Sequence, residues 1–184
     1  SLLVMRSMLS QDGIINVMLK NAGWIQKSLP FFSNVAWARI TVIVVNLWIG
    51  IPYTMMQVTG ILQNIPLELY EAAEVYGAGP VIRFFKITLP YMLFVTTPYL
   101  ITTFTANINN FNIVYLLTKG DPVLSGNTAG KTDLLVTWLY KMTVDYQYYN
   151  LGAVIGIMTF VFLAIGSLLV YRRTKSYKDE EGFQ

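Results

Sequence analysis

The sequence predicts an all-α membrane protein, built as a bundle of transmembrane helices. Of its 184 residues, 54% are hydrophobic and only 12% are charged, which is about half the charged fraction of a soluble domain. The charges are also unevenly spread, because none falls in residues 40–67, 87–118 or 146–171. A membrane-spanning helix needs roughly 20 consecutive apolar residues. Each of these segments is longer than that, so we expect each to contain one span.

The residue types that are missing exclude several chemistries. The chain has no histidine and no cysteine, so it lacks the commonest general base and metal ligand and has no thiol chemistry. We therefore expect no catalytic residue and no metal site. An intramembrane enzyme or a proton-coupled transporter needs ionisable groups inside the membrane, and the three long segments have none. The basic residues form no single patch, so no nucleic acid partner is expected.

Three complete spans are expected, at about residues 36–57, 89–115 and 150–171. Residues 1–9 look like the tail of an earlier span, and we expect the first half of that span to lie outside this chain. A charged tail follows the last span over residues 172–184.

Two of the connecting segments are expected to differ in character. Residues 11–33 form a mixed loop with turn signals at both ends. Residues 118–145 combine a loop rich in turn formers with an amphipathic interfacial helix over 132–144. Thr132 or Asp133 can cap the start of that helix.

Small residues mark the start of the last span. Gly152 and Gly156 form a GxxxG pattern. Such a pattern permits close contact with another helix, or it reflects ordinary packing of small residues.

The stretch GNTAGKTD, Gly126 to Asp133, ends like a phosphate-binding loop. A true loop of that kind needs four residues between its two glycines, a strand before it and a helix after it. Here Gly126 and Gly130 enclose three residues, and the preceding sequence has the composition of a loop. We expect this chain to bind no nucleotide at this place.

The most polar connection, residues 64–88, predicts a pair of short helices outside the membrane. Leu67 to Val75 contains good helix formers, with acidic residues early, where they suit the helix dipole. Gly77 ends this helix, and Pro80 is suited to the first turn of a second one that extends to Lys86. Such a corner favours docking on another surface over a merely solvated loop.

This same segment resembles the EAA motif of ABC-importer permeases. The matching string is Glu71-Ala72-Ala73, three residues, Gly77, nine residues, then Ile87-x-Leu89-Pro90. The flanking strings VVNLWIGIPYTMM, FFKITLP, NINNF and AGKTDLLVTWLYK are similar to the MalF-type subunits of maltose and maltodextrin importers. The resemblance covers about residues 11–171, with two departures: Tyr76 replaces a common Asp, and TKGDP replaces Thr-x-Gly-Gly-Pro. Such permeases have six or more spans, so we expect this chain to be a C-terminal portion.

The resemblance implies a type I (MetI-like) ABC-importer permease fold in the plasma or inner membrane, with the coupling helix pair in the cytoplasm. The residues implied to contact the ATPase subunit are Glu71, Ala72, Ala73, Gly77, Leu89 and Pro90. Implied partners are a dimer of ATPase subunits that carries ATP and Mg, a second permease subunit (MalG-like), an extracytoplasmic sugar-binding protein, and membrane lipid. No cofactor is expected on this chain. The orientation depends on the motif, because the basic residues divide equally between the two sides.

Polar residues inside two spans are candidates for a substrate path. Asn46 shares a helix face with the positions that follow it at 49, 50 and 53, and Thr103, Asn107 and Asn110 recur at helical spacing in the next span. Amides and hydroxyls suit sugar hydroxyls, and aromatic rings suit sugar faces. Hydrogen bonding that only holds the helices together explains the same pattern, and the residues alone do not decide between these two explanations.

The resemblance favours the substrate path, since the matching positions line the maltose site in MalF-type permeases. The residues concerned are Asn46, Ile49, Gly50, Tyr53, Thr103, Ala106 and Asn107, to which we add Asn110. The expected function is therefore the sugar-conducting subunit of an ATP-driven importer for maltose or maltodextrin. The alternatives are a permease of the same family for another sugar or a polyol, and a purely structural membrane subunit.

Overall fold

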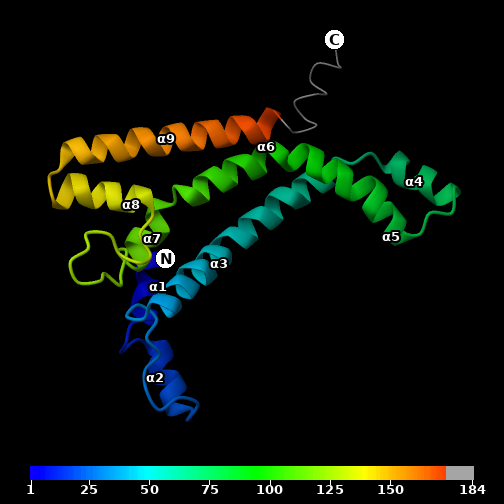
Figure 1. Ribbon diagram of the computed structural model, residues 1–184. Coiled ribbons are helices and arrows are strands. Elements are labelled where there is room, and N and C mark those ends of the chain that lie inside the picture. Colours follow the sequence, from blue (N-terminus) through cyan, green and yellow to red (C-terminus); the bar gives the residue numbers. More distant parts are fainter. Residues whose placement is uncertain (173–184) are drawn as a thin grey trace. The chain divides into compact units, whose positions relative to one another are not determined.

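The computed structural model describes residues Ser1–Arg172, all of whose regular elements are helical. In chain order (Figure 1) they are α1 (Leu2–Met8), α2 (Ile14–Asn21), α3 (Val35–Leu62), α4 (Leu67–Val75), α5 (Pro80–Arg83), the π-helical turn η1 (Phe84–Thr88), α6 (Leu89–Ile108), α7 (Phe111–Leu117), α8 (Leu135–Tyr140), a second π-helical turn η2 (Lys141–Asp145) and α9 (Tyr149–Arg172). Beyond Arg172, the predicted charged tail lies outside the described residues.

Three helical segments of the described chain are long and apolar enough to cross a membrane, namely Val35–Leu62, Pro80–Leu117 and Tyr149–Arg172. Each contains most of one of the three charge-free segments of the sequence. The prediction of an all-α membrane protein is confirmed. Most large apolar side chains on these helices are exposed in this chain, which is typical of surfaces that lipid or neighbouring membrane subunits cover.

The second span differs from the single helix predicted over 89–115. At its start, helical structure runs on from Pro80 through η1 into α6, so the predicted short helix over 80–86 does not end. Pro90 cannot donate a backbone hydrogen bond and crowds the carbonyl four residues before it, and the wider π-helical turn lies directly before it. At its end, α6 stops at Ile108, and Asn110 caps a new helix by accepting a hydrogen bond from the Ile113 backbone at 3.3 Å.

The predicted loop over 11–33 contains a helix, α2, that one buried side chain ties down. The Asn16 amide is fully buried and donates to the carbonyls of Ser10 and Leu29, at 3.0 and 3.3 Å. Its oxygen accepts the Leu29 backbone N–H at 2.8 Å. Because a buried amide needs such partners, this residue fixes both ends of the segment around α2.

The residues group into two compact units, Ser1–Ile49 with Asn107–Phe162, and Gly50–Ala106 with the chain from Leu163. The first unit holds most of the described core, with Ala38, Val45, Val114, Leu117 and Met142 buried. It also buries polar groups, with Thr118 and Thr137 almost fully enclosed. The second unit contains α4, α5 and most of α6.

The two glycines of the GxxxG pattern at the start of α9 face α8 and η2 of the same chain, and α8 lies beside α9 in Figure 1. A Cβ atom added at Gly152 would collide with the Thr143 side chain of η2, and one added at Gly156 would lie 3.3 Å from Leu139 of α8. The two glycines therefore let α9 pack closely on α8 and η2.

We predict that Gly152→Ala lowers stability by about 1–3 kcal/mol, because it overpacks this contact. Gly166→Ala, in the same helix, meets nothing within 4 Å and should raise stability by about 0.5–1 kcal/mol, since alanine has the higher helix propensity. Thermal unfolding of the detergent-solubilised protein measures both. Equal effects of the two substitutions would contradict the close packing at Gly152.

Candidate functional site

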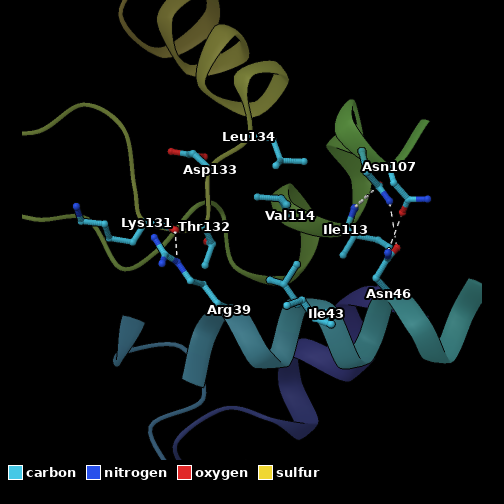
Figure 2. Close-up of a pocket in the computed structure, with 12 residues that line it drawn as sticks. Arg39, Ile43, Asn46, Asn107, Ile113, Val114, Lys131, Thr132, Asp133 and Leu134 are labelled. Carbon is cyan, nitrogen blue, oxygen red and sulfur yellow. Dashed lines mark hydrogen bonds between the residues drawn. The ribbon is translucent and has the colours of Figure 1, made fainter. Parts of the chain in front are cut away.

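Three of the predicted substrate-facing asparagines come together in the first unit (Figure 2). The Asn46 amide of α3 donates to the Asn107 side-chain oxygen at the end of α6, at 2.8 Å. The Asn110 amide donates to the Asn46 oxygen at 3.3 Å. Asn110 also caps α7, so the cap fixes one member of this amide cluster. We call these three residues the amide cluster.

The amide cluster forms one end of a pocket of about 300 Å³. Its lining residues are Arg39, Val42, Ile43, Asn46, Asn107, Asn110, Ile113, Val114, Lys131, Thr132, Asp133 and Leu134. Polar groups thus alternate with branched apolar side chains around the cavity. A few fixed polar groups in an otherwise apolar lining are typical of a small-molecule site, and this mixture suits a ligand that has hydroxyl groups at its edge and carbon–hydrogen faces.

The remaining predicted substrate-facing residues do not line this pocket. Ile49 lies in the first unit and is exposed, and Gly50, Tyr53, Thr103 and Ala106 belong to the second unit. A Cβ atom at Gly50 would meet nothing within 4 Å, so its backbone is open to close approach.

Tyr53 lies in a second polar cluster, inside the second unit. Its hydroxyl accepts a hydrogen bond from the Gln57 amide at 3.0 Å, and its ring lies 6.5 Å from that of Tyr99. The Tyr99 hydroxyl is 3.3 Å from the Thr54 hydroxyl. These polar groups of α3 and α6 therefore satisfy one another, as groups within a membrane must.

Arg39 and residues 131–134 are pocket residues that the sequence analysis did not single out. The Arg39 Nε–H donates to the Lys131 carbonyl at 3.2 Å, across 92 residues of sequence (Figure 2). In the sequence these residues stand out only as a lone arginine in the first turns of a predicted span and as the GKT string. Neither feature predicts that the two segments meet, because their proximity depends on how the loop after α7 folds back.

A buried ion pair holds that loop. The Asp133 carboxylate lies 2.7 Å from the Lys141 ammonium, and the two side chains are 3% and 12% exposed. The carboxylate also accepts hydrogen bonds from the Gly130 backbone at 2.7 Å and the Thr137 hydroxyl at 2.9 Å. The predicted helix over 132–144 begins only at Leu135, since Asp133 turns back onto Gly130.

Close backbone contacts and two threonines complete the same loop. An added Cβ at Gly130 would collide with the Gly120 backbone, and one at Gly120 would collide with the Asp133 and Lys141 side chains. The Thr118 and Thr132 hydroxyls lie 2.9 Å apart, and Thr132 donates to the Asp121 carbonyl at 2.7 Å. The GNTAGKTD stretch therefore ends as part of a fixed pocket wall between α7 and α8.

Aromatic rings pack beside this wall. Phe111 and Tyr115 stack at 4.8 Å between ring centres, and Tyr140 lies 5.1 and 5.0 Å from them. The hydrogen bond with Tyr115 raises the pKa of Tyr140 above its ordinary value. The Tyr140 hydroxyl is therefore neutral at physiological pH and acts only as a hydrogen-bonding group.

The corner between α4 and α5 has the geometry that its glycine predicts. Gly77 has φ of +75°, its N–H donates to the Glu74 carbonyl at 2.9 Å, and the Ala78 N–H donates to the Ala73 carbonyl at 2.9 Å. This is the Schellman motif that ends many helices. Across the corner, Arg83 pairs with Glu74 at 3.3 Å.

The surface of this corner is unusually apolar for a connection outside the membrane. Val75 and Tyr76 are 86% and 90% exposed. Of the predicted coupling residues, Glu71, Ala72, Gly77 and Pro90 are exposed, and Ala73 and Leu89 are partly buried.

Residues 3–176 match the protein family described as "Binding-protein-dependent transport system inner membrane component". The chain belongs to this family. It is accordingly an integral protein of the inner membrane, as its three long apolar helices also indicate.

Two relatives of this chain are named as permeases of different sugar transport systems. The chain is 43% identical over 152 residues to the galactooligosaccharides transport system permease protein GanP of Bacillus subtilis, covering 83% of this chain and 36% of the relative. It is 40% identical over 176 residues to the maltose/maltodextrin transport system permease protein MalF of Escherichia coli K12, covering 92% of this chain and 34% of the relative. The chain therefore spans about a third of the length of these relatives.

The fold is also that of a solved importer. A bacterial ABC transporter involved in the import of the acidic polysaccharide alginate superposes with a TM-score of 0.75 at 23% identity, covering 92% of this chain and 59% of that one. The type I permease fold predicted from the sequence is confirmed.

The two ion pairs of the described residues predict losses of stability of different size when one charge is removed. Asp133→Asn leaves the Lys141 ammonium buried without a counter-charge and should cost about 3 kcal/mol of stability. Glu74→Gln removes the partner of Arg83 at a site where the Glu74 side chain is 71% exposed, and should cost less than about 1 kcal/mol. Thermal unfolding of the two variants compares them, and a loss at Asp133 no larger than that at Glu74 would argue against a buried pair.

Proposed function

We propose that this chain forms part of the translocation path of an ATP-driven importer that carries maltose or maltodextrin. The observation that carries the proposal is the pocket around the amide cluster, with amide groups at one end and branched apolar side chains beside them. Membership of the transport family and the names of its MalF relatives support the same function.

The chemistry of the pocket matches that of a sugar. Each side-chain amide offers donors and an acceptor, so the amide cluster can exchange its internal hydrogen bonds for bonds to sugar hydroxyls without a large cost. Val42, Ile43 and Val114 provide apolar walls for the carbon–hydrogen faces of the ring. Tyr53, Thr103 and the open backbone at Gly50, which belong to the second unit, are proposed as further sugar contacts.

The α4–α5 corner is proposed to couple this chain to an ATPase subunit. Glu71, Ala72, Ala73 and Gly77, together with Leu89 and Pro90, form the contact, and the exposed Val75 and Tyr76 add apolar surface to it. ATP and Mg are held by the partner. Closure of two ATPase subunits would move the corner as a rigid body and alternate the access of the sugar site.

The proposed assembly includes a second permease subunit and a binding protein that delivers the sugar from outside the membrane. A second solved structure with a similar fold is a bacterial alginate ABC transporter in complex with an alginate pentasaccharide-bound periplasmic protein. The periplasmic protein in that complex supports a binding-protein partner for this chain.

A second candidate substrate is a galacto-oligosaccharide, which the 43% identity to GanP favours. Uptake competition separates the two candidates in a strain whose only sugar importer contains the full-length protein. Labelled maltose uptake should be displaced by maltodextrins and not by galacto-oligosaccharides. Displacement by galacto-oligosaccharides and not by maltodextrins would select the second candidate. Uptake of neither maltose nor galacto-oligosaccharides would refute the proposed function.

Asn107→Ala is predicted to reduce sugar uptake at least tenfold while the importer still assembles. The substitution removes hydrogen bonds between Asn107 and the sugar, so sugar hydroxyls in the pocket are left without partners. The matched control is Thr105→Ala, which removes another contact between helices, the 3.1 Å hydrogen bond to Ser167. Uptake and copurification of the subunits are measured for both. If the two variants lose uptake equally, or if Asn107→Ala prevents assembly, the asparagine serves packing only.

Gly77→Ala is predicted to reduce sugar-stimulated ATP hydrolysis and uptake together, since φ of +75° costs a residue with a Cβ roughly 1–2 kcal/mol and shifts the corner. Gly79→Ala is the control, because Gly79 has φ of −68° and nothing within 4 Å of an added Cβ. Normal coupling in the Gly77 variant would contradict the proposed role of the corner.

A further inference from the structure

Arg39 lies at the end of the pocket opposite the amide cluster (Figure 2). It precedes Asn46 by seven residues on α3, so the two side chains lie on one helix face. At 1.5 Å per residue, their backbones are about 10 Å apart along the axis. A ligand that contacts both residues must therefore extend along α3 over about two helical turns.

The Arg39 guanidinium has donors to spare. A guanidinium carries five N–H groups, and one of them is used, in the bond to the Lys131 carbonyl. The ion pairs found in residues 1–172 are Glu74 with Arg83 and Asp133 with Lys141. Asp133 also lines the pocket, but its carboxylate is already bound to three donors, so it does not neutralise Arg39.

The group that orients Arg39 is itself fixed. The Lys131 carbonyl lies between Gly130, whose N–H donates to Asp133, and Thr132, whose hydroxyl donates to the Asp121 carbonyl. The buried pair of Asp133 and Lys141 anchors this short segment. One hydrogen bond from Nε to this fixed carbonyl therefore orients the exposed guanidinium, and the other N–H groups form no hydrogen bond within residues 1–172.

We propose that Arg39 is a second sugar-binding residue, which donates hydrogen bonds to the hydroxyls of the sugar unit next to the one held by the amide cluster. The pocket then selects chains of two or more units over single sugars. This inference rests on the proposed function, and it adds a specificity residue to the same site. Charged donors form the stronger hydrogen bonds, so Arg39 should contribute substantially to the affinity for a disaccharide.

Two other roles for Arg39 give different results. As an anchor for the loop alone, it would shape the whole pocket, and its loss would weaken single sugars and disaccharides alike. As a contact for lipid headgroups at the membrane surface, it would affect assembly or lipid binding and leave sugar affinity unchanged. Lys27 provides a control for charge, because it is an exposed cation that does not line the pocket.

The test measures sugar binding to the full-length importer complex purified in detergent, with methyl α-glucoside as the one-unit probe and maltose as the two-unit probe. If the uptake competition selects galacto-oligosaccharides, methyl β-galactoside and galactobiose replace them. The variants are Arg39→Met, Arg39→Lys and Lys27→Met, each checked for an intact complex by gel filtration.

We expect Arg39→Met to weaken maltose binding about tenfold or more and to leave methyl α-glucoside binding unchanged. Arg39→Lys keeps the charge and loses the planar fork, so it should recover part of the affinity even if the methionine variant folds poorly. Lys27→Met should bind both probes normally. Equal loss of both probes, or no loss of either, overturns the inference. A wild-type complex that binds none of the sugars refutes the proposed function instead.

Discussion

The hydrogen bond between Asn46 and Asn107 is the contact on which the rest of the site depends. A membrane offers no water to an amide within a span, so each amide must find a partner in the protein or line a cavity. Here the amides of α3 and the end of α6 pair with each other, and the helix break at Asn110 adds a third. The same requirement that holds the two segments together also gathers hydrogen-bonding groups at one end of a pocket. Ligand binding, as proposed, would therefore use side chains that already serve packing.

The opposite wall of the pocket is formed by a loop, and the buried ion pair of Asp133 and Lys141 fixes this loop. A buried ion pair is weak evidence for stability, because desolvation offsets much of the attraction. It does specify one geometry, since Asp133 accepts from Lys141, Gly130 and Thr137 together. Glycines at 120 and 130 let the backbones approach closely enough for this arrangement. The result is a preformed surface beside α3, to which Arg39 of that helix donates a further hydrogen bond.

The features that the sequence predicted well are those set by local rules. Charge-free segments of membrane length give the spans. Gly77 was predicted to end its helix, and α4 stops at Val75 with Gly77 following at φ of +75°. The structure differs where local rules compete or where distant segments meet. The second span was expected to begin at about residue 89, but helical structure continues into it from Pro80 through a π-helical turn. The contact from Arg39 to Lys131 and the buried pair at Asp133 could not be predicted, because each depends on how the loop after α7 folds back across the chain.

The central claim is that the amide-cluster pocket opens to water and holds sugar, and the accessibility of one cysteine tests it most directly. This chain has no cysteine, so Val42→Cys, which replaces an apolar pocket residue by one of similar size, adds the one thiol of residues 1–184. Any cysteine elsewhere in the full-length importer is first replaced by serine. We predict that a charged, membrane-impermeant thiol reagent modifies position 42 and that the transported sugar slows this modification. Val44→Cys, on the same helix and outside the pocket, should show no effect of sugar. A cysteine at position 42 that never reacts, or reacts at the same rate with saturating sugar, would contradict the claim and leave the asparagines with a packing role alone.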